Sequence, residues 1–159
     1  MDRANSSSEQ QALTLQQALD LAVQHHTSGR FPEAKDIYQK ILQTDPNQPI
    51  ALHLLGVIFH QVGENIQAVD LIKKAIDIKP DYAEAHNNLG TALQDLGELE
   101  AAVTSYHNAL TIKFDYAETH SNLGLALKEM GKLEAAVDSF HKALTIKQDY
   151  AEVHSNLGV

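Results

Sequence analysis

The sequence contains no cysteine and no tryptophan. The lack of cysteine excludes disulfide bonds, thiolate nucleophiles and zinc sites with thiolate ligands, and it agrees with a reducing compartment. With 43% apolar and 21% charged residues among 159, the chain has enough hydrophobic material for one modest domain.

Long hydrophobic runs are missing as well. No stretch approaches the roughly 18 uninterrupted apolar residues of a membrane-spanning helix, and residues 1–11 lack the apolar core of a signal peptide. We therefore expect a cytoplasmic protein that does not associate with membranes.

Positive charge is scarce. Twelve Lys and Arg residues stand against 21 Asp and Glu residues, which gives a formal net charge of -9. No local basic cluster offsets this excess, so a phosphate backbone or an anionic membrane surface would be repelled. The expected partner is a protein or peptide, and nucleic acid is not expected.

The chain is built from an internal repeat of 34 residues. Residues 83–116 align with residues 117–150 without a gap, and 23 of the 34 positions are identical. Stepping by the same period defines repeats at 15–48 and 49–82 and a partial fifth at 151–159. The polar residues 1–14 precede the array and are expected to be partly disordered.

Several columns recur at this period, and each has a steric role. Glycines between two helical patterns mark a turn that favours positive φ. Small alanines early in the second pattern allow two helices to approach closely, and large leucines fill the space between helices. The columns are Gly29, Gly63, Gly97 and Gly131; Ala34, Ala68, Ala102 and Ala136; and Leu21, Leu55, Leu89, Leu123 and Leu157. Each repeat is therefore predicted to be helix, turn, helix, in an all-α fold.

Helix boundaries are also predicted. An acidic or hydroxyl residue three positions before Glu or Gln indicates a capping box. The candidates are Asp81 with Glu84, Asp115 with Glu118, Asp149 with Glu152, and Thr14 with Gln17. Pro46 and Pro80 are expected to stop the second helices of their repeats.

The pattern resembles the tetratricopeptide-repeat family, with Leu-Gly in the first helix and Ala-x3-aromatic in the second, every 34 residues. The resemblance implies a right-handed α-solenoid of antiparallel helix pairs, whose concave surface is lined by the first helix of each repeat and binds a protein. One departure is the family's Trp column, which reads Ala18, Leu52, His86, His120 and His154 here.

An asparagine column is the most informative feature of the predicted concave surface. Asn88, Asn122 and Asn156 each precede a Leu-Gly pair. An amide both donates and accepts, so the column could pair with the backbone of an extended peptide. It is similar to the asparagine ladder of the O-linked N-acetylglucosamine transferases. Simple duplication of an Asn-Leu-Gly motif explains it equally well.

Neighbouring columns complete the set of candidate contacts. Asn87, Ser121, Thr91, Gln94 and Lys128 are expected beside the asparagines. Leu54 and Val57 replace polar residues in the second repeat, and they form either an apolar patch for a partner or a surface packed under the N-terminal segment.

No catalytic, cofactor or metal site is predicted. His86, His120 and His154 share one column, but successive helices lie ~8–10 Å apart, too far for one zinc ion at ~2 Å from two of them. Phosphate-binding loops, HExxH pairs and nucleophile elbows are missing from the sequence.

Two functions of different class fit these observations. The first is an interaction scaffold that binds a peptide or protein on its concave surface. The alternative is the non-catalytic front of a repeat-containing glycosyltransferase similar to the O-linked N-acetylglucosamine transferases. Because residues 151–159 begin a first helix without a second, we also expect a fragment of a longer protein, whose final face frays or self-associates.

Overall fold

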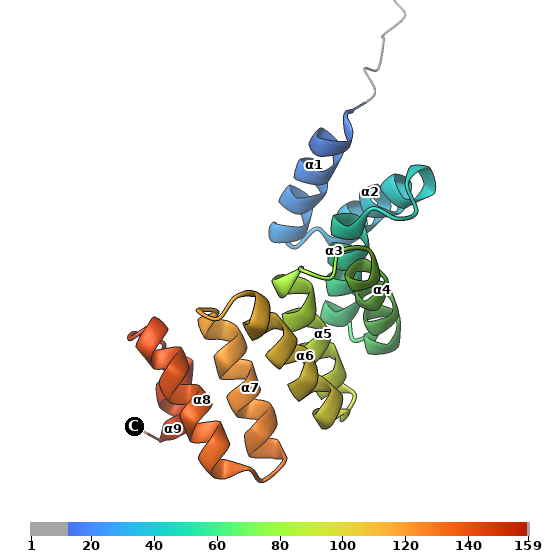
Figure 1. Ribbon diagram of the computed structural model, residues 1–159. Coiled ribbons are helices and arrows are strands. Elements are labelled where there is room, and N and C mark those ends of the chain that lie inside the picture. Colours follow the sequence, from blue (N-terminus) through green and yellow to red (C-terminus); the bar gives the residue numbers. More distant parts are fainter. Residues whose placement is uncertain (1–12, 159) are drawn as a thin grey trace, which may run out of the picture.

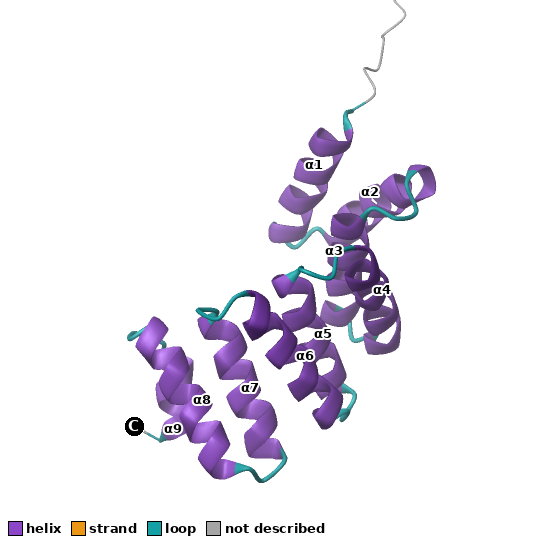
Figure 2. Cartoon of the chain, in the orientation of Figure 1, coloured by secondary structure: helices purple, strands orange, loops and turns teal. Residues whose placement is uncertain are grey.

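The computed structural model describes residues 13–158, and in that range it contains nine α-helices and no strand (Figures 1 and 2). The helices are α1 (Leu15–Thr27), α2 (Phe31–Thr44), α3 (Pro49–Gln61), α4 (Asn65–Ile78), α5 (Ala83–Asp95), α6 (Leu99–Ile112), α7 (Ala117–Glu129), α8 (Leu133–Ile146) and α9 (Ala151–Leu157). Most of the polar segment predicted for residues 1–14 lies outside the described residues.

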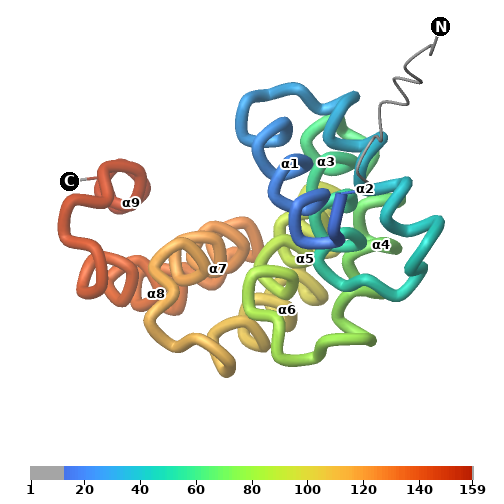
Figure 3. Tube along the Cα trace, turned by 90° about the horizontal axis from the view of Figure 1, so that it is seen from above, coloured from blue at the N-terminus to red at the C-terminus, as the bar shows by residue number. Residues whose placement is uncertain are grey.

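The helices form consecutive antiparallel pairs, which confirms the predicted all-α repeat solenoid. Each helix packs mainly on its neighbours in the sequence, both within a pair and between pairs. Seen from above in Figure 3, the helix pairs follow a curved path rather than a straight line. The buried residues form one core cluster over α1–α3 and another over α4–α9, and Phe59 packs against both. Packing between neighbouring pairs is expected because a single hairpin cannot bury its own apolar face.

The turn within each repeat is made by the predicted glycine. Gly29, Gly63, Gly97 and Gly131 have φ between 74° and 84°, the left-handed region in which other residues are strained. The chain closes each first helix there and reverses direction within three residues.

Close helix contacts explain the small-residue columns. The predicted alanine column is at most 2% exposed, and four residues later a large side chain fills the core at no more than 1% exposure. These large residues are Tyr38, Ile72, Tyr106 and Phe140. A Cβ added at Gly90 would lie 2.5 Å from the Tyr106 ring, and one at Gly124 would lie 2.5 Å from the Phe140 ring. In the second to fourth repeats the glycine of the Leu-Gly motif therefore makes room for the core side chain of its own second helix, while Ala22 occupies this position in the first repeat.

Three of the four predicted capping boxes are wrong. Thr14 and Gln17 do form one at the start of α1. At α5, α7 and α9 the N-cap residues are Tyr82, Tyr116 and Tyr150, and no side chain caps the helix. The preceding aspartates lie one residue too early for a capping box, because each tyrosine occupies the cap.

A cation–π contact accompanies each of these tyrosines. Lysine ammonium groups lie 4.5–4.8 Å from the ring centroids. The pairs are Lys79 with Tyr82, Lys113 with Tyr116, and Lys147 with Tyr150. Such contacts stabilise a folded chain by about 0.5–1 kcal/mol at exposed sites. The linkers before α5, α7 and α9 are therefore stabilised by a cation–π contact, although no side chain caps these helices.

The second helices end as predicted at the two prolines, since α2 ends at Thr44 and α4 at Ile78. The later second helices end at the same repeat position without proline, so proline is not needed for the stop. No helix within residues 13–158 is long and apolar enough to cross a membrane.

Candidate peptide-binding surface

The first helices of the repeats line the inner side of the array. Contacts that skip a helix join α3 to α5 and α5 to α7. First helices of neighbouring repeats are therefore closer together than second helices are, and a solenoid curves toward its more crowded side. All the candidate contact residues lie on α3, α5, α7 and α9.

The asparagine column forms hydrogen bonds between repeats. Asn88 Nδ2 lies 2.8 Å from His53 Nε2, and Asn122 Nδ2 donates to Asn87 Oδ1 over 3.1 Å. Both bonds join residues 35 apart, so each asparagine contacts the repeat before its own. We call these contacts the amide row.

A carboxylate sets the direction of the contact between Asn87 and Asn122. Asn87 Nδ2 donates to Glu118 Oε1 over 3.2 Å, and an ionised carboxylate can only accept. Asn87 Oδ1 therefore accepts from Thr119 Oγ1 at 2.9 Å and from Asn122 Nδ2. Since Asn122 presents an N–H group to Asn87, its own Oδ1 is directed elsewhere. Within residues 13–158, Oδ1 of Asn88 and of Asn122 takes part in no hydrogen bond.

The next contact of the amide row is not formed. Ser121 occupies the position equivalent to Asn87, and Asn156 the position equivalent to Asn122. Ser121 Oγ and Asn156 Nδ2 are both buried, and neither has a hydrogen-bond partner in the described part of the chain. Serine is shorter than the asparagine that makes the equivalent contact at Asn87, and the buried amide of Asn156 is left unsatisfied.

We predict that Ser121→Asn stabilises the protein. An asparagine at this position would accept from Asn156 Nδ2 as Asn87 accepts from Asn122, and one satisfied buried bond contributes about 1 kcal/mol. Urea unfolding followed by circular dichroism measures the change. Ser155→Asn, at an exposed position of the same column, is the control and should have no effect. Equal or lower stability of Ser121→Asn would contradict the described geometry.

A second row of hydrogen bonds joins the carboxyl ends of the first helices. His26 Nε2 lies 2.8 Å from Gln61 Oε1, and His60 Nε2 lies 2.7 Å from Asp95 Oδ2. Gln94 Nε2 donates to Glu129 Oε1 over 2.5 Å, and Gln94 Oε1 accepts from the Tyr106 hydroxyl. The three bonds between first helices also join residues 35 apart and hold successive repeats in register, whereas the Tyr106 bond lies within one repeat.

The candidate contacts differ in their access to the inner surface. Asn87 and Ser121 are only 1% exposed, so their side chains serve the repeat interfaces and do not face a ligand. Thr91 is half-buried and donates to the Asn87 carbonyl, Gln94 is half-buried within the second row, and Lys128 is exposed.

The apolar end of the surface contains a cavity of about 460 Å³. It is lined by Val23, His26, Thr27, Gly29, Phe31, Leu54 and Gln61. Leu54 is therefore placed between the first two repeats, where its side chain is half-buried. Val57 is also half-buried on α3 but does not line this cavity.

His53 joins three elements of the surface through two hydrogen-bond contacts, and the sequence analysis did not identify it. It is 3% exposed, its Nδ1 lies 2.8 Å from the Tyr82 hydroxyl, and its Nε2 meets Asn88. Burial lowers the pKa of His53 to about 4, and the nearby His26 contributes to the shift. The only sequence signal was its column, one residue before the asparagine column.

The column of histidines that replaces the family's tryptophan links the first helices to the preceding linkers. Nε2 of His86, His120 and His154 lies 2.9–3.0 Å from the carbonyl oxygen of the residue six positions earlier. These carbonyls belong to Pro80, Phe114 and Gln148. The recurrence of histidine thus has a structural role that the sequence pattern alone did not indicate.

Charge is uneven along the inner surface. Exposed acidic side chains lie on α5, α7 and α9, whereas α3 carries none. The acids are Glu84, Asp95, Glu118, Glu129 and Glu152, and Lys128 is the basic residue among the candidate contacts. The surface is therefore apolar at one end and acidic with amides at the other.

The fold and its repeat-to-repeat contacts define the chain as an α-solenoid of helix–turn–helix units. It belongs to the tetratricopeptide-repeat family. The family model for the TPR repeat matches residues 58–97 and 92–131, and the model for the tetratricopeptide repeat matches residues 117–150. Together the matches cover more than half of the chain. Membership of this family supports a role as a protein-interaction scaffold. The repeat fold is typical of non-catalytic scaffolds.

Solved structures of other repeat proteins are similar to this chain. A crystal structure of MamA is 29% identical, covering 87% of this chain and 81% of that one, with a TM-score of 0.79. PilF from Pseudomonas aeruginosa is 26% identical, covering 86% and 62%, with a TM-score of 0.80. An O-GlcNAc transferase from Thermobaculum terrenum is 30% identical over 80% of this chain, which spans 25% of the transferase, with a TM-score of 0.76. No curated protein matches the chain.

Proposed function

We propose that the inner surface binds an extended segment of a partner protein and that Asn88, Asn122 and Asn156 lie along its backbone. The observation that carries this proposal is the direction of the amide row. Asn88 and Asn122 hold the same position in consecutive repeats, and each uses Nδ2 at the repeat interface. Their carbonyl oxygens form a periodic set of acceptors for backbone N–H groups, independent of the partner's sequence.

Side-chain selectivity comes from the two ends of the surface. The cavity beside Leu54 accepts a large apolar side chain, and Val57 extends the same apolar helix face. Thr91, Gln94 and Lys128 line the amide end. The excess of carboxylates there favours a segment that carries lysine or arginine. Asn87 acts indirectly, by joining neighbouring repeats, and the buried Ser121 does not contact the segment.

A displayed library of random linear dodecapeptides tests this proposal. Peptides selected on the wild-type chain should bind the double variant Asn88→Ala, Asn122→Ala about thirtyfold more weakly, because two hydrogen bonds of about 1 kcal/mol each are lost. Fluorescence anisotropy with labelled peptides measures the affinities.

The matched control is Asn108→Ala, an exposed asparagine on the second helix α6. It should leave the affinity unchanged. Because the two inner asparagines also join repeats, both variants are compared below their thermal transitions, with helicity checked by circular dichroism. If the selected peptides bind the double variant as tightly as the control, the amide row is not the binding site.

A second candidate function is substrate binding for a glycosyltransferase encoded in the same gene. The similarity to the Thermobaculum terrenum O-GlcNAc transferase, at 30% identity over 80% of this chain, favours it. Sequencing the gene beyond the codon for residue 159 decides the matter. A transferase domain would support this candidate, and a stop codon at that point would exclude it.

A further inference from the structure

The contact that orients Asn88 differs in chemistry from the contact that orients Asn122. Asn122 donates to Asn87, whose own direction is set by the Glu118 carboxylate. Asn88 instead places Nδ2 at 2.8 Å from Nε2 of His53, and within residues 13–158 no carboxylate bonds to either of these side chains. The direction of the Asn88 amide therefore has to come from the imidazole.

His53 can orient an amide because its ring is buried and held from both sides. The side chain is 3% exposed, and its Nδ1 lies 2.8 Å from the Tyr82 hydroxyl. The two rings are also in edge contact, with centroids 4.6 Å apart. Burial lowers the pKa of His53 to about 4, and the nearby His26 adds to the shift. At pH 7 the ring is therefore neutral and carries a single N–H hydrogen.

The position of that hydrogen follows from the amide. The NH₂ group of Asn88 can only donate, so Nε2 of His53 accepts from it and carries no hydrogen. The hydrogen is then on Nδ1, where it donates to the Tyr82 oxygen. In the reverse arrangement the Tyr82 hydroxyl would donate to Nδ1 and Nε2–H would donate to Oδ1 of Asn88. The amide hydrogens of Asn88, and not its oxygen, would then face the inner surface.

We propose that His53 is the positioning residue for the first asparagine of the amide row. Its Nδ1–H tautomer, anchored by Tyr82, turns the side-chain oxygen of Asn88 toward the inner surface. This inference rests on the proposed function, because it explains how that oxygen becomes available to a peptide N–H group. His53 is too deeply buried to contact the bound segment itself. Consecutive repeats thus present the same acceptor by different means, a buried imidazole and a carboxylate.

Nitrogen NMR of the whole chain without ligand tests the orientation. Long-range ¹H–¹⁵N spectra distinguish imidazole nitrogens that carry a hydrogen from those that do not, and the spectrum of His53→Asn identifies the signals of His53. At pH 7 the expected result is a hydrogen on Nδ1 and none on Nε2. A hydrogen on Nε2 would overturn the proposal, whether or not the inner surface binds peptides.

Substitutions at the same position test the effect on binding. Peptides selected on the wild-type chain should bind His53→Phe about fivefold more weakly, because phenylalanine offers no acceptor and leaves the Asn88 amide free to rotate. His53→Asn should bind like the wild type, since asparagine accepts from the next amide at the equivalent Asn87. His107→Phe, at an exposed site on α6, is the matched control and should have no effect.

A purely structural role for His53 predicts a different pattern. If the ring only packs between repeats, His53→Phe should keep the wild-type affinity once circular dichroism has confirmed its helicity, and this result would overturn the proposal. Equal weakening by His53→Phe and His53→Asn would overturn it as well. Selected peptides that are insensitive to Asn88→Ala would contradict the proposed function, while the NMR result still decides whether His53 orients Asn88.

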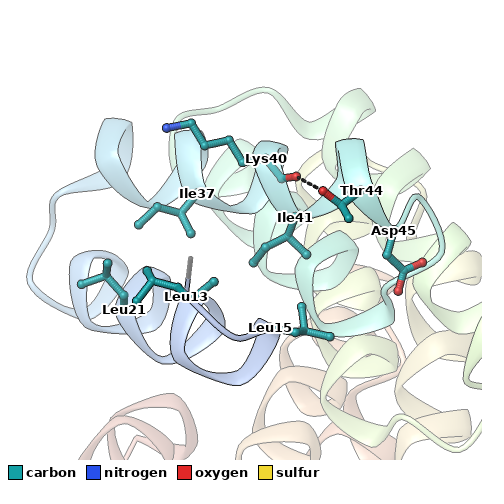
Figure 4. Close-up of a pocket in the computed structure, with 9 residues that line it drawn as sticks. Leu13, Leu15, Leu21, Ile37, Lys40, Ile41, Thr44 and Asp45 are labelled. Carbon is teal, nitrogen blue, oxygen red and sulfur yellow. Dashed lines mark hydrogen bonds between the residues drawn. The ribbon is translucent and has the colours of Figure 1, made fainter. Parts of the chain in front are cut away.

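The apolar hollow between α1 and α2 is a rival site for the selected peptides (Figure 4). It has a volume of about 510 Å³, and its lining includes Leu13 and Leu15 but neither His53 nor Asn88. Leu15 is 48% exposed, so Leu15→Lys introduces a charge without burying it. Peptides whose binding is weakened by Leu15→Lys and not by His53→Phe would lie in this hollow, and that result would overturn the proposal.

Discussion

Replacing Phe140 by alanine is expected to lower the free energy of unfolding by about 3–5 kcal/mol. The ring is 1% exposed and lies against the backbone of Gly124, where even an added Cβ would be 2.5 Å away. Neighbouring helices cannot collapse onto the vacated space without losing their other contacts, so most of the cavity would remain. Urea unfolding followed by circular dichroism measures the loss.

Phe114→Ala is the matched control for this prediction. Phe114 is 81% exposed, and its removal should change stability by less than about 0.5 kcal/mol. Repeat arrays can unfold in parts, so the Phe140→Ala transition is expected to begin in the last repeats. Similar losses for both variants would contradict the assignment of Phe140 to the core.

The protein should lose stability as the pH falls from 7 to 5, in part because of His53. The pKa of this buried side chain is lowered to about 4 in the folded state, against 6.5 for an ordinary histidine. Between these values the unfolded chain binds the proton and the folded chain does not, so stability rises with pH across this window. The His53 contribution lost between pH 7 and pH 5 is about 2 kcal/mol.

His53→Asn isolates this contribution. Asparagine is the residue at the equivalent position of the next repeat, where it bonds to Asn122, so it can keep the contact to Asn88. Unfolding free energies of wild type and variant are compared at both pH values, with His107→Asn at an exposed position as the control. An unchanged pH dependence in His53→Asn would show that His53 is not held neutral.

The fold was predictable because its determinants are periodic. Glycine at each turn, alanine at each close helix contact and leucine between helices recur every 34 residues, and the structure uses them in those roles. Helix starts were harder to predict. Asp81 satisfies a capping pattern in the sequence, but Tyr82 occupies the cap, and local pattern alone does not show which residue does so.

The inner surface was predictable only in part. The column pattern identified Asn88 and Asn122, but their partners lie 35 residues away, and this offset depends on the angle between neighbouring repeats. For the same reason the roles of His53 and Asn87 at the repeat interface were not apparent. Both lie in one column, and they could be identified only when neighbouring first helices were seen in contact.

These contacts link the stability of the array to its proposed binding. Asn88 and Asn122 each use Nδ2 in a contact with the preceding repeat and keep Oδ1 for a ligand. A bound segment would therefore contact side chains whose orientation is already set, which reduces the entropy lost on binding. Glu118 contributes without touching the ligand, because its carboxylate directs Asn87 and hence Asn122.

Backbone reading by the amide row is tested most directly by an N-methyl scan. A dodecapeptide selected on the wild-type chain is resynthesised with one backbone amide methylated at a time, and each version is titrated against the chain. If Oδ1 of Asn88 and of Asn122 accept from peptide N–H groups, methylation at two positions should weaken binding about fivefold or more, because each removes a hydrogen bond of about 1 kcal/mol. The Asn88→Ala variant should become insensitive at one of them and Asn122→Ala at the other. A scan in which no position is sensitive, or in which both alanine variants keep the wild-type profile, would contradict backbone recognition by this surface.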